Sequence, residues 1–229
     1  MSSSWLQFFG NDLYALLISV IALLAYHLYL RERLRRDPTY TIHGVNVLAR
    51  TAWVGHVMQA GNRDILAVQT LRNAIMGPVF LASTAALLMV GTLTLTGQID
   101  KLGATWHELN LFGTISTLLW QGKIIMLLLD FMVAFFAFTQ SIRLFIHVGF
   151  MINVPVALDH GPLAPAQVAL HLNRAGSFHS IGMRAYYFAV PLTFWLFGPH
   201  FMLLATFGLI PALYMVDRTP GQVPERGDL

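Results

Sequence analysis

The chain has 229 residues, of which 56% are hydrophobic and 11% are charged, with a mean hydropathy of +0.61. Soluble domains carry about 25% charged residues, so this composition excludes an ordinary soluble protein and indicates a single-domain integral membrane protein. The sequence has no cysteine, which excludes disulfides, thiolate catalysis, iron–sulfur ligation and c-type haem attachment. The formal net charge is only +3, so the placement of the basic residues is more informative than their excess.

Four apolar runs are long enough to cross a bilayer, at about 12–30, 68–97, 122–150 and 184–215. About 20 apolar residues suffice to cross the hydrocarbon core as a helix, and hydrocarbon tolerates only backbone whose hydrogen bonds are closed. The expected fold class is therefore all-α, with four transmembrane helices. Gly198-Pro199 predicts a kink or a break within the last span.

Between the first two spans, residues 40–62 carry apolar side chains such as Val45, Trp53 and Val57 at a helical period. This pattern predicts an additional amphipathic helix on the cytoplasmic side. Two placements are open for it. The helix lies along the inner membrane surface with Trp53 at headgroup level, or it packs under the helix bundle.

Basic residues indicate the topology. The first span is followed at once by RERLRR, residues 31–36, and cytoplasmic loops carry the excess of Lys and Arg. With four spans, ten of the 14 Lys and Arg residues fall on this inner side. The predicted location is a bacterial inner membrane with both termini on the outer, periplasmic side. The polar tail, residues 217–229, contains Pro and Gly and is expected to be flexible.

Four stretches resemble a known family: RTAWVGHVM (50–58), RNAIMGPVFLASTAALLMVG (72–91), GKIIMLLLDFMVAFFAFTQSIR (122–143) and GMRAYYFAVPLTFWLFGP (182–199). Together they are similar to the family called domain of unknown function 599, multi-pass membrane proteins of bacteria and plants. The most specific piece is Arg-Ala-Tyr-Tyr-Phe, residues 184–188. The resemblance implies a four-span architecture and carries over no catalytic residue.

Asp130 is the first candidate for a functional group, because it lies inside the third span. A carboxylate near the middle of a span costs roughly 2.5–3.5 kcal/mol on insertion scales, so it should face protein or water. The alternative is a purely structural role, in which the carboxyl group is protonated or paired with a group on a neighbouring helix. His200 is placed in the outer half of the last span, beside the Gly198-Pro199 break. We therefore expect Asp130 and His200 to approach each other as an intramembrane polar site.

Arginine and histidine supply the remaining candidates. Arg143 and Arg184 mark the inner ends of two spans and are candidate lipid or anion contacts. The favoured alternative is a structural role, in which they snorkel and pair with helix C-terminal carbonyls or a carboxylate. His27 and His147 are the best available pair of haem ligands, because both fall near the inner boundary. The nine histidines match no zinc spacing, and no metal site is predicted.

No nucleotide-binding, hydrolase or kinase motif occurs in the sequence. The leading interpretation is a non-catalytic accessory or scaffold subunit that contacts the lipid bilayer and other membrane subunits or itself, without nucleic acid. One alternative is a small transporter or channel protomer that uses Asp130. A second alternative is a redox subunit that bears haem or a metal; otherwise no cofactor is expected.

Overall fold

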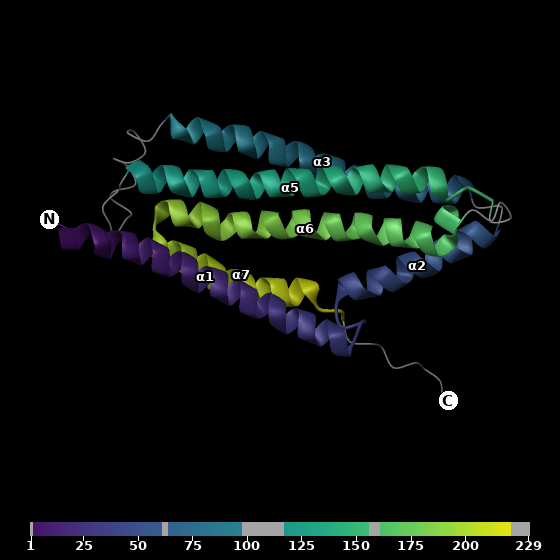
Figure 1. Cartoon of the computed structure of the whole chain (residues 1–229), viewed down its shortest axis with the longest axis horizontal. Helices are drawn as coiled ribbons and strands as arrows, with labels where there is room; N and C mark the ends of the chain where they lie inside the picture. Colours follow the sequence, from purple (N-terminus) through teal and green to yellow (C-terminus); the bar gives the residue numbers. More distant parts are fainter. Residues whose placement is uncertain (1, 61–63, 98–116, 156–160, 221–229) are drawn as a thin grey trace.

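The computed structural model describes residues 2–60, 64–97, 117–155 and 161–220, and these are helical for most of their length (Figure 1). The outer segment around Trp106 and the last residues of the predicted tail lie outside the described ranges. The helices, with one 3-10 turn, are α1 (Ser2–Arg36), α2 (Ile42–Ala60), α3 (Asp64–Thr96), α5 (Thr117–Met151), η2 (Gly161–Leu163), α6 (Pro165–Phe197) and α7 (Pro199–Asp217).

Four of these helices are long and apolar enough to cross a membrane, within the described part of the chain. They cover Gly10–Arg36, Asp64–Thr96, Leu118–Met151 and Pro199–Asp217. The all-α fold class with four such helices is thereby confirmed. Their large apolar side chains stay exposed on the surface of the bundle, for example Phe80 at 79% and Met215 at 80%, as expected for side chains that face lipid.

The last predicted span, 184–215, is corrected by the structure. This region is not one crossing helix, because α6 ends at Phe197, the chain reverses at Gly198, and α7 runs back along α6 (Figure 1). The backbone of Gly198 has φ 148°, a conformation that side-chain-bearing residues rarely adopt, and Pro199 starts the next helix. The break at Gly198-Pro199 was therefore expected at the right place, but it is a full reversal.

The start of α6 also differs from the expectation. The helix begins at Pro165 and spans 33 residues, so the segment expected as an inner loop is its first half. This half carries Arg174 and several histidines and serines, which lowers its hydropathy. It remains helical inside the bundle because α2 and α5 pack against it.

The reversal moves the end of the described chain. Thr41 forms an isolated bridge with Arg218, and the Thr219 hydroxyl donates to the carbonyl of Thr39 at 2.8 Å. Arg218 therefore lies at the same end of the bundle as the arginines that close α1, whereas α1 starts at the opposite end (Figure 1). The start of α1 and the end of the described chain therefore lie at opposite ends of the bundle.

Residues 42–60 form the expected helix between the first two long helices, α2. It packs against α6 rather than lying apart from the bundle, and Val54, Val57 and Met58 are buried in a core shared with α3, α5 and α6. Trp53 is partly buried against that core. Of the two placements that the sequence left open, the structure agrees with packing of this helix against the bundle.

Small residues let α3, α5 and α6 approach closely. Ala82, Ala134 and Ala185 from the three helices surround Phe138, which is fully buried. Gly182 faces the same ring, and a Cβ atom added there lies 2.6 Å from Phe138 Cε1. Close packing of small residues is the main source of helix association in lipid, so this contact holds the centre of the bundle together.

We predict that Gly182→Ala lowers the free energy of unfolding in detergent by about 1–3 kcal/mol, because the buried ring has to move. The matched control is Gly149→Ala on α5, where an added Cβ atom meets nothing within 4 Å. The control should be unchanged or more stable by up to about 1 kcal/mol. Equal thermal stability of the two variants would contradict this packing.

Candidate functional site

Two polar clusters join α1 to the rest of the bundle, one near each end of a cavity. The first, the Asp12 cluster, consists of Asp12, Lys123 and Trp195. Lys123 Nζ lies 2.7 Å from Asp12 Oδ1, and the indole N–H of Trp195 donates to the same oxygen at 2.7 Å. The ammonium group also lies 5.3 Å from the centroid of the Trp195 ring, within cation–π range. This cluster ties α1, α5 and α6 together.

The second, the Asp217 cluster, consists of Asp217, Tyr26 and Arg184. The Tyr26 hydroxyl donates to Asp217 Oδ2 at 2.8 Å, and Arg184 Nη2 lies 3.6 Å from the same oxygen. Arg184 therefore has a carboxylate partner within the protein, which favours the structural interpretation of this residue over a lipid or anion contact. This cluster ties α1, α6 and α7 together.

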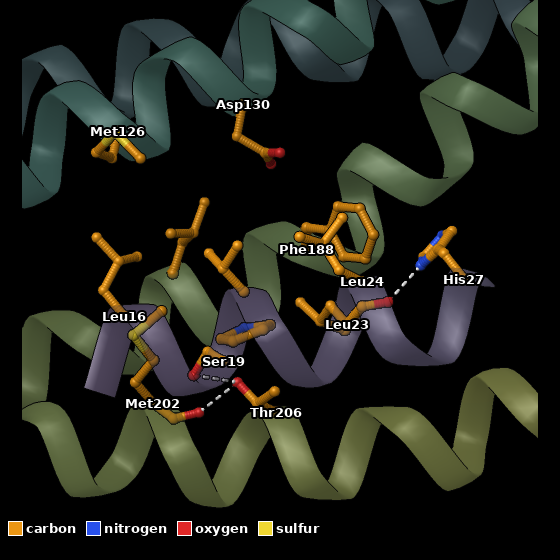
Figure 2. A pocket seen from close by; sticks show the side chains of 13 residues that line it. Leu16, Ser19, Leu23, Leu24, His27, Met126, Asp130, Phe188, Met202 and Thr206 are labelled. Carbon is orange, nitrogen blue, oxygen red and sulfur yellow. Dashed lines mark hydrogen bonds between the residues drawn. The ribbon is translucent and has the colours of Figure 1, made fainter. Parts of the chain in front are cut away.

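Between the two clusters, side chains of α1, α5, α6 and α7 enclose a cavity of about 350 Å³. Most of its lining is aliphatic, aromatic or thioether, with Leu23, Met126 and Phe188 on three different helices (Figure 2). On the α7 side, the Thr206 hydroxyl bonds to Ser19 and to the carbonyl of Met202, so these hydroxyls are already satisfied. The cavity has the size and the mostly apolar lining of a small-molecule site.

Asp130 is the acidic group in this cavity. Its carboxyl group projects from α5 into the open space between the helices (Figure 2). Oδ2 is buried and has no hydrogen-bond partner among the described residues. Buried polar atoms are nearly always paired in native structures, so this unpaired carboxyl oxygen makes Asp130 the leading candidate for a functional group in the cavity.

His27 lies at one end of the same cavity (Figure 2). Its Nδ1 is 2.8 Å from the carbonyl oxygen of Leu23. A carbonyl oxygen only accepts, so Nδ1 carries the proton and Nε2 of the neutral ring is left as an acceptor. The ring packs edge-on against Phe188 with a centroid distance of 5.7 Å. The cavity thus offers one carboxyl group and one imidazole acceptor on apolar walls.

Asp130 and His200, which were expected to approach each other, line two different cavities. His200 lies in the first turn of α7, in a separate hollow with Asn11, Tyr14 and Pro199. The reversal at Gly198 is the reason, since it moves His200 out of the helix that faces α5. The structure instead brings Asp130 and His27 to one cavity, a pairing that the sequence analysis missed because α1 and α5 are distant in the chain.

The proposed haem pair is also separated. His27 lines the Asp130 cavity, whereas the His147 ring lies 5.0 Å from the ring of His171 in another cavity. Arg143, the second candidate anion contact, lines that other cavity too. Among the described residues, no group of three or more His, Asp or Glu side chains is arranged to hold a metal ion.

Comparison with known proteins identifies one family. Residues 14–221 match the model of a family described as protein of unknown function, DUF599. The chain belongs to this family. No curated protein and no solved structure matches the chain. The DUF599 match covers both polar clusters except Asp12, and it covers the whole lining of the Asp130 cavity.

We predict that Lys123→Met lowers the free energy of unfolding by about 3 kcal/mol, because it leaves the Asp12 carboxylate without its cation in a site where the two side chains are only 10% and 14% exposed. The matched control is Glu32→Gln, which breaks the pair between Glu32 and Arg36 whose side chains are 52% and 73% exposed. The control should change stability by less than about 0.5 kcal/mol. Thermal unfolding in detergent measures both, and equal losses would be inconsistent with a structural Asp12 cluster.

Proposed function

We propose that this DUF599 protein is a small membrane transporter that exchanges protons for a lipophilic cation at Asp130. The observation that carries this proposal is the carboxyl group of Asp130, whose Oδ2 atom has no partner among the described residues and faces an otherwise apolar cavity.

The chemistry follows from the cost of an unpaired charge in an apolar space. A carboxyl group in such a cavity is stable as the neutral acid, or as a carboxylate that is paired with a bound cation. Binding of one monovalent cation therefore releases one proton from Asp130, and binding of a proton releases the cation. His27 lines the same cavity and adds a polar group to its otherwise apolar wall.

The ligand class follows from the walls and the access. Aliphatic and aromatic side chains favour an apolar or aromatic body, and a volume of about 350 Å³ suits a small organic molecule. Val20 and Leu24 line the cavity and are 43% and 57% exposed. A ligand dissolved in the bilayer reaches Asp130 from the side, past these two side chains.

An accessory or scaffold subunit is the competing function, and it stays a prediction. The exposed apolar face of α3 fits lipid and a partner helix equally well, so it does not favour a scaffold. A scaffold has no need of an unpaired carboxyl group in a cavity, which is why we rank the transporter first.

The same proposal includes a location in a bacterial inner membrane with the arginine-rich end towards the cytoplasm. Arg33, Arg174 and Arg218 all belong to that end. With the reversal at Gly198, α1 starts on the periplasmic side and α7 ends on the cytoplasmic side.

Proteoliposomes that hold the purified protein test the transport function. With the lumen acidic, we expect the unmodified protein to drive uptake of the lipophilic cation ethidium, and we expect Asp130→Asn to slow this uptake at least about tenfold. The matched control is Asp64→Asn, which neutralises an exposed carboxylate at the start of α3 outside the cavity, and it should transport normally.

A second variant tests whether transport needs the open cavity in addition to the carboxyl group. Val20→Trp keeps Asp130 but fills the space beside it, so uptake should fall to a similar extent. Uptake by the unmodified protein that does not depend on the proton gradient, or uptake that survives Asp130→Asn, would overturn the proposal.

A further inference from the structure

A second cavity, of about 470 Å³, lies between α5 and α6 at the arginine-rich end of the bundle. Four cationic or imidazole side chains line it: Arg143 and His147 from α5, and His171 and Arg174 from α6. The positions of these residues along α5 and α6 explain why their side chains lie together. Arg143 and His147 are four residues apart on one helix, as are Arg174 and Phe178 on the other, so each pair lies on one helix face.

Among the described residues, no carboxylate lines this cavity. Neither Arg143 nor Arg174 forms a salt bridge among the described residues, although the Arg174 guanidinium lies 5.9 Å from the ring centroid of Phe178. Nδ1 of His171 is buried and lacks a hydrogen-bond partner among the same residues. Two other described arginines of the inner side do have carboxylate partners: Arg36 pairs with Glu32 and Arg184 with Asp217. The described lining therefore holds two guanidinium groups with no carboxylate beside them, and Gln140 adds an amide group.

A phosphate group fits these donors. Guanidinium groups bind phosphate oxygens through two parallel N–H···O bonds, and such charge-assisted bonds are about twice as strong as neutral ones. Two guanidinium groups from two helices, with imidazole N–H groups beside them, can satisfy both non-bridging oxygens of a phosphodiester at once. A cation is excluded by the same charges.

The position of the cavity favours a lipid as the source of the phosphate. Arg143 follows Lys123 on α5 by about 20 residues, or about 30 Å of helix, which equals the thickness of the hydrocarbon core. If Lys123 marks one boundary, Arg143 lies at headgroup level of the other. Ile146 and Phe150 line the same cavity and are 46% and 79% exposed, so an acyl chain has an apolar surface directly beside the phosphate site.

We propose that Arg143, His147, His171 and Arg174 form a binding site for the phosphate group of an anionic phospholipid. The site is independent of Asp130, which lies in the other cavity. It also reassigns Arg143, whose partner in anion binding is Arg174 rather than Arg184.

Native mass spectrometry of the purified full chain in detergent tests the site, with phosphatidylglycerol and phosphatidylcholine as the lipid probes. The test variant is the double substitution Arg143→Gln/Arg174→Gln. The control is Arg72→Gln, an exposed arginine on α3 that does not line the cavity. We expect phosphatidylglycerol to bind at least about tenfold more tightly than phosphatidylcholine, and we expect the double variant but not the control to lose this preference.

Two further measurements make the outcomes distinct. A thermal-unfolding midpoint of the double variant close to that of the control shows that lost binding does not come from lost folding. If the double variant unfolds, the single variants Arg143→Lys and Arg174→Lys replace it. These keep the charge but not the bidentate geometry, and they should weaken binding. Competition by inorganic phosphate at millimolar concentration, with no preference between the two lipids, would overturn the lipid assignment and leave a site for free phosphate. Undiminished phosphatidylglycerol binding by the folded double variant would overturn the site itself.

Discussion

The ion pair between Asp12 and Lys123 is the contact on which the rest of the arrangement depends. A charge at the edge of hydrocarbon is costly unless it is paired, so these two side chains, with the Trp195 N–H as a third partner, determine where α1 meets α5 and α6. In the same way, the Asp217 cluster joins α1, α6 and α7 near the other end of the cavity. Along the rest of its length α1 packs mainly on α7. The space between the two clusters is left open, and Asp130 faces it.

The helix α6 connects both candidate sites. Near its C-terminal end it supplies Phe188 and Pro191 to the cavity that contains Asp130, and near its N-terminal end it supplies His171 and Arg174 to the basic cavity. It can carry so many polar groups because α2, α5 and α7 cover it. One end of the bundle thus offers donors for an anion, whereas the middle offers an unpaired acid in an apolar space.

Hydropathy predicted α1, α3 and α5 to within a few residues in their apolar parts, because these helices expose large faces to lipid and their sequences are correspondingly apolar. It failed for α6, where protein rather than lipid covers the helix and the first half is polar. Glycine and proline chemistry located the break at Gly198, but only the structure shows that the chain reverses there. Asp130 was recognised as unusual from its place in the sequence. His27 was singled out only as a candidate haem ligand, and its place in the same cavity as Asp130 was not predicted. The position of α1 depends on the Asp12 and Asp217 clusters, which leave no local pattern in the sequence.

The two polar clusters fix α1 near both ends of the cavity and leave Asp130 facing open space between them. An experimental structure by electron cryo-microscopy, of the protein purified in lipid nanodiscs, tests this claim most directly. The account predicts that the space between α1 and α5 stays free of protein side chains, that Asp12 contacts Lys123 and Trp195, and that non-protein density reaches the Asp130 carboxyl group. A structure in which α1 packs directly on α5, and Asp130 is hydrogen-bonded to a side chain of the protein, would contradict it.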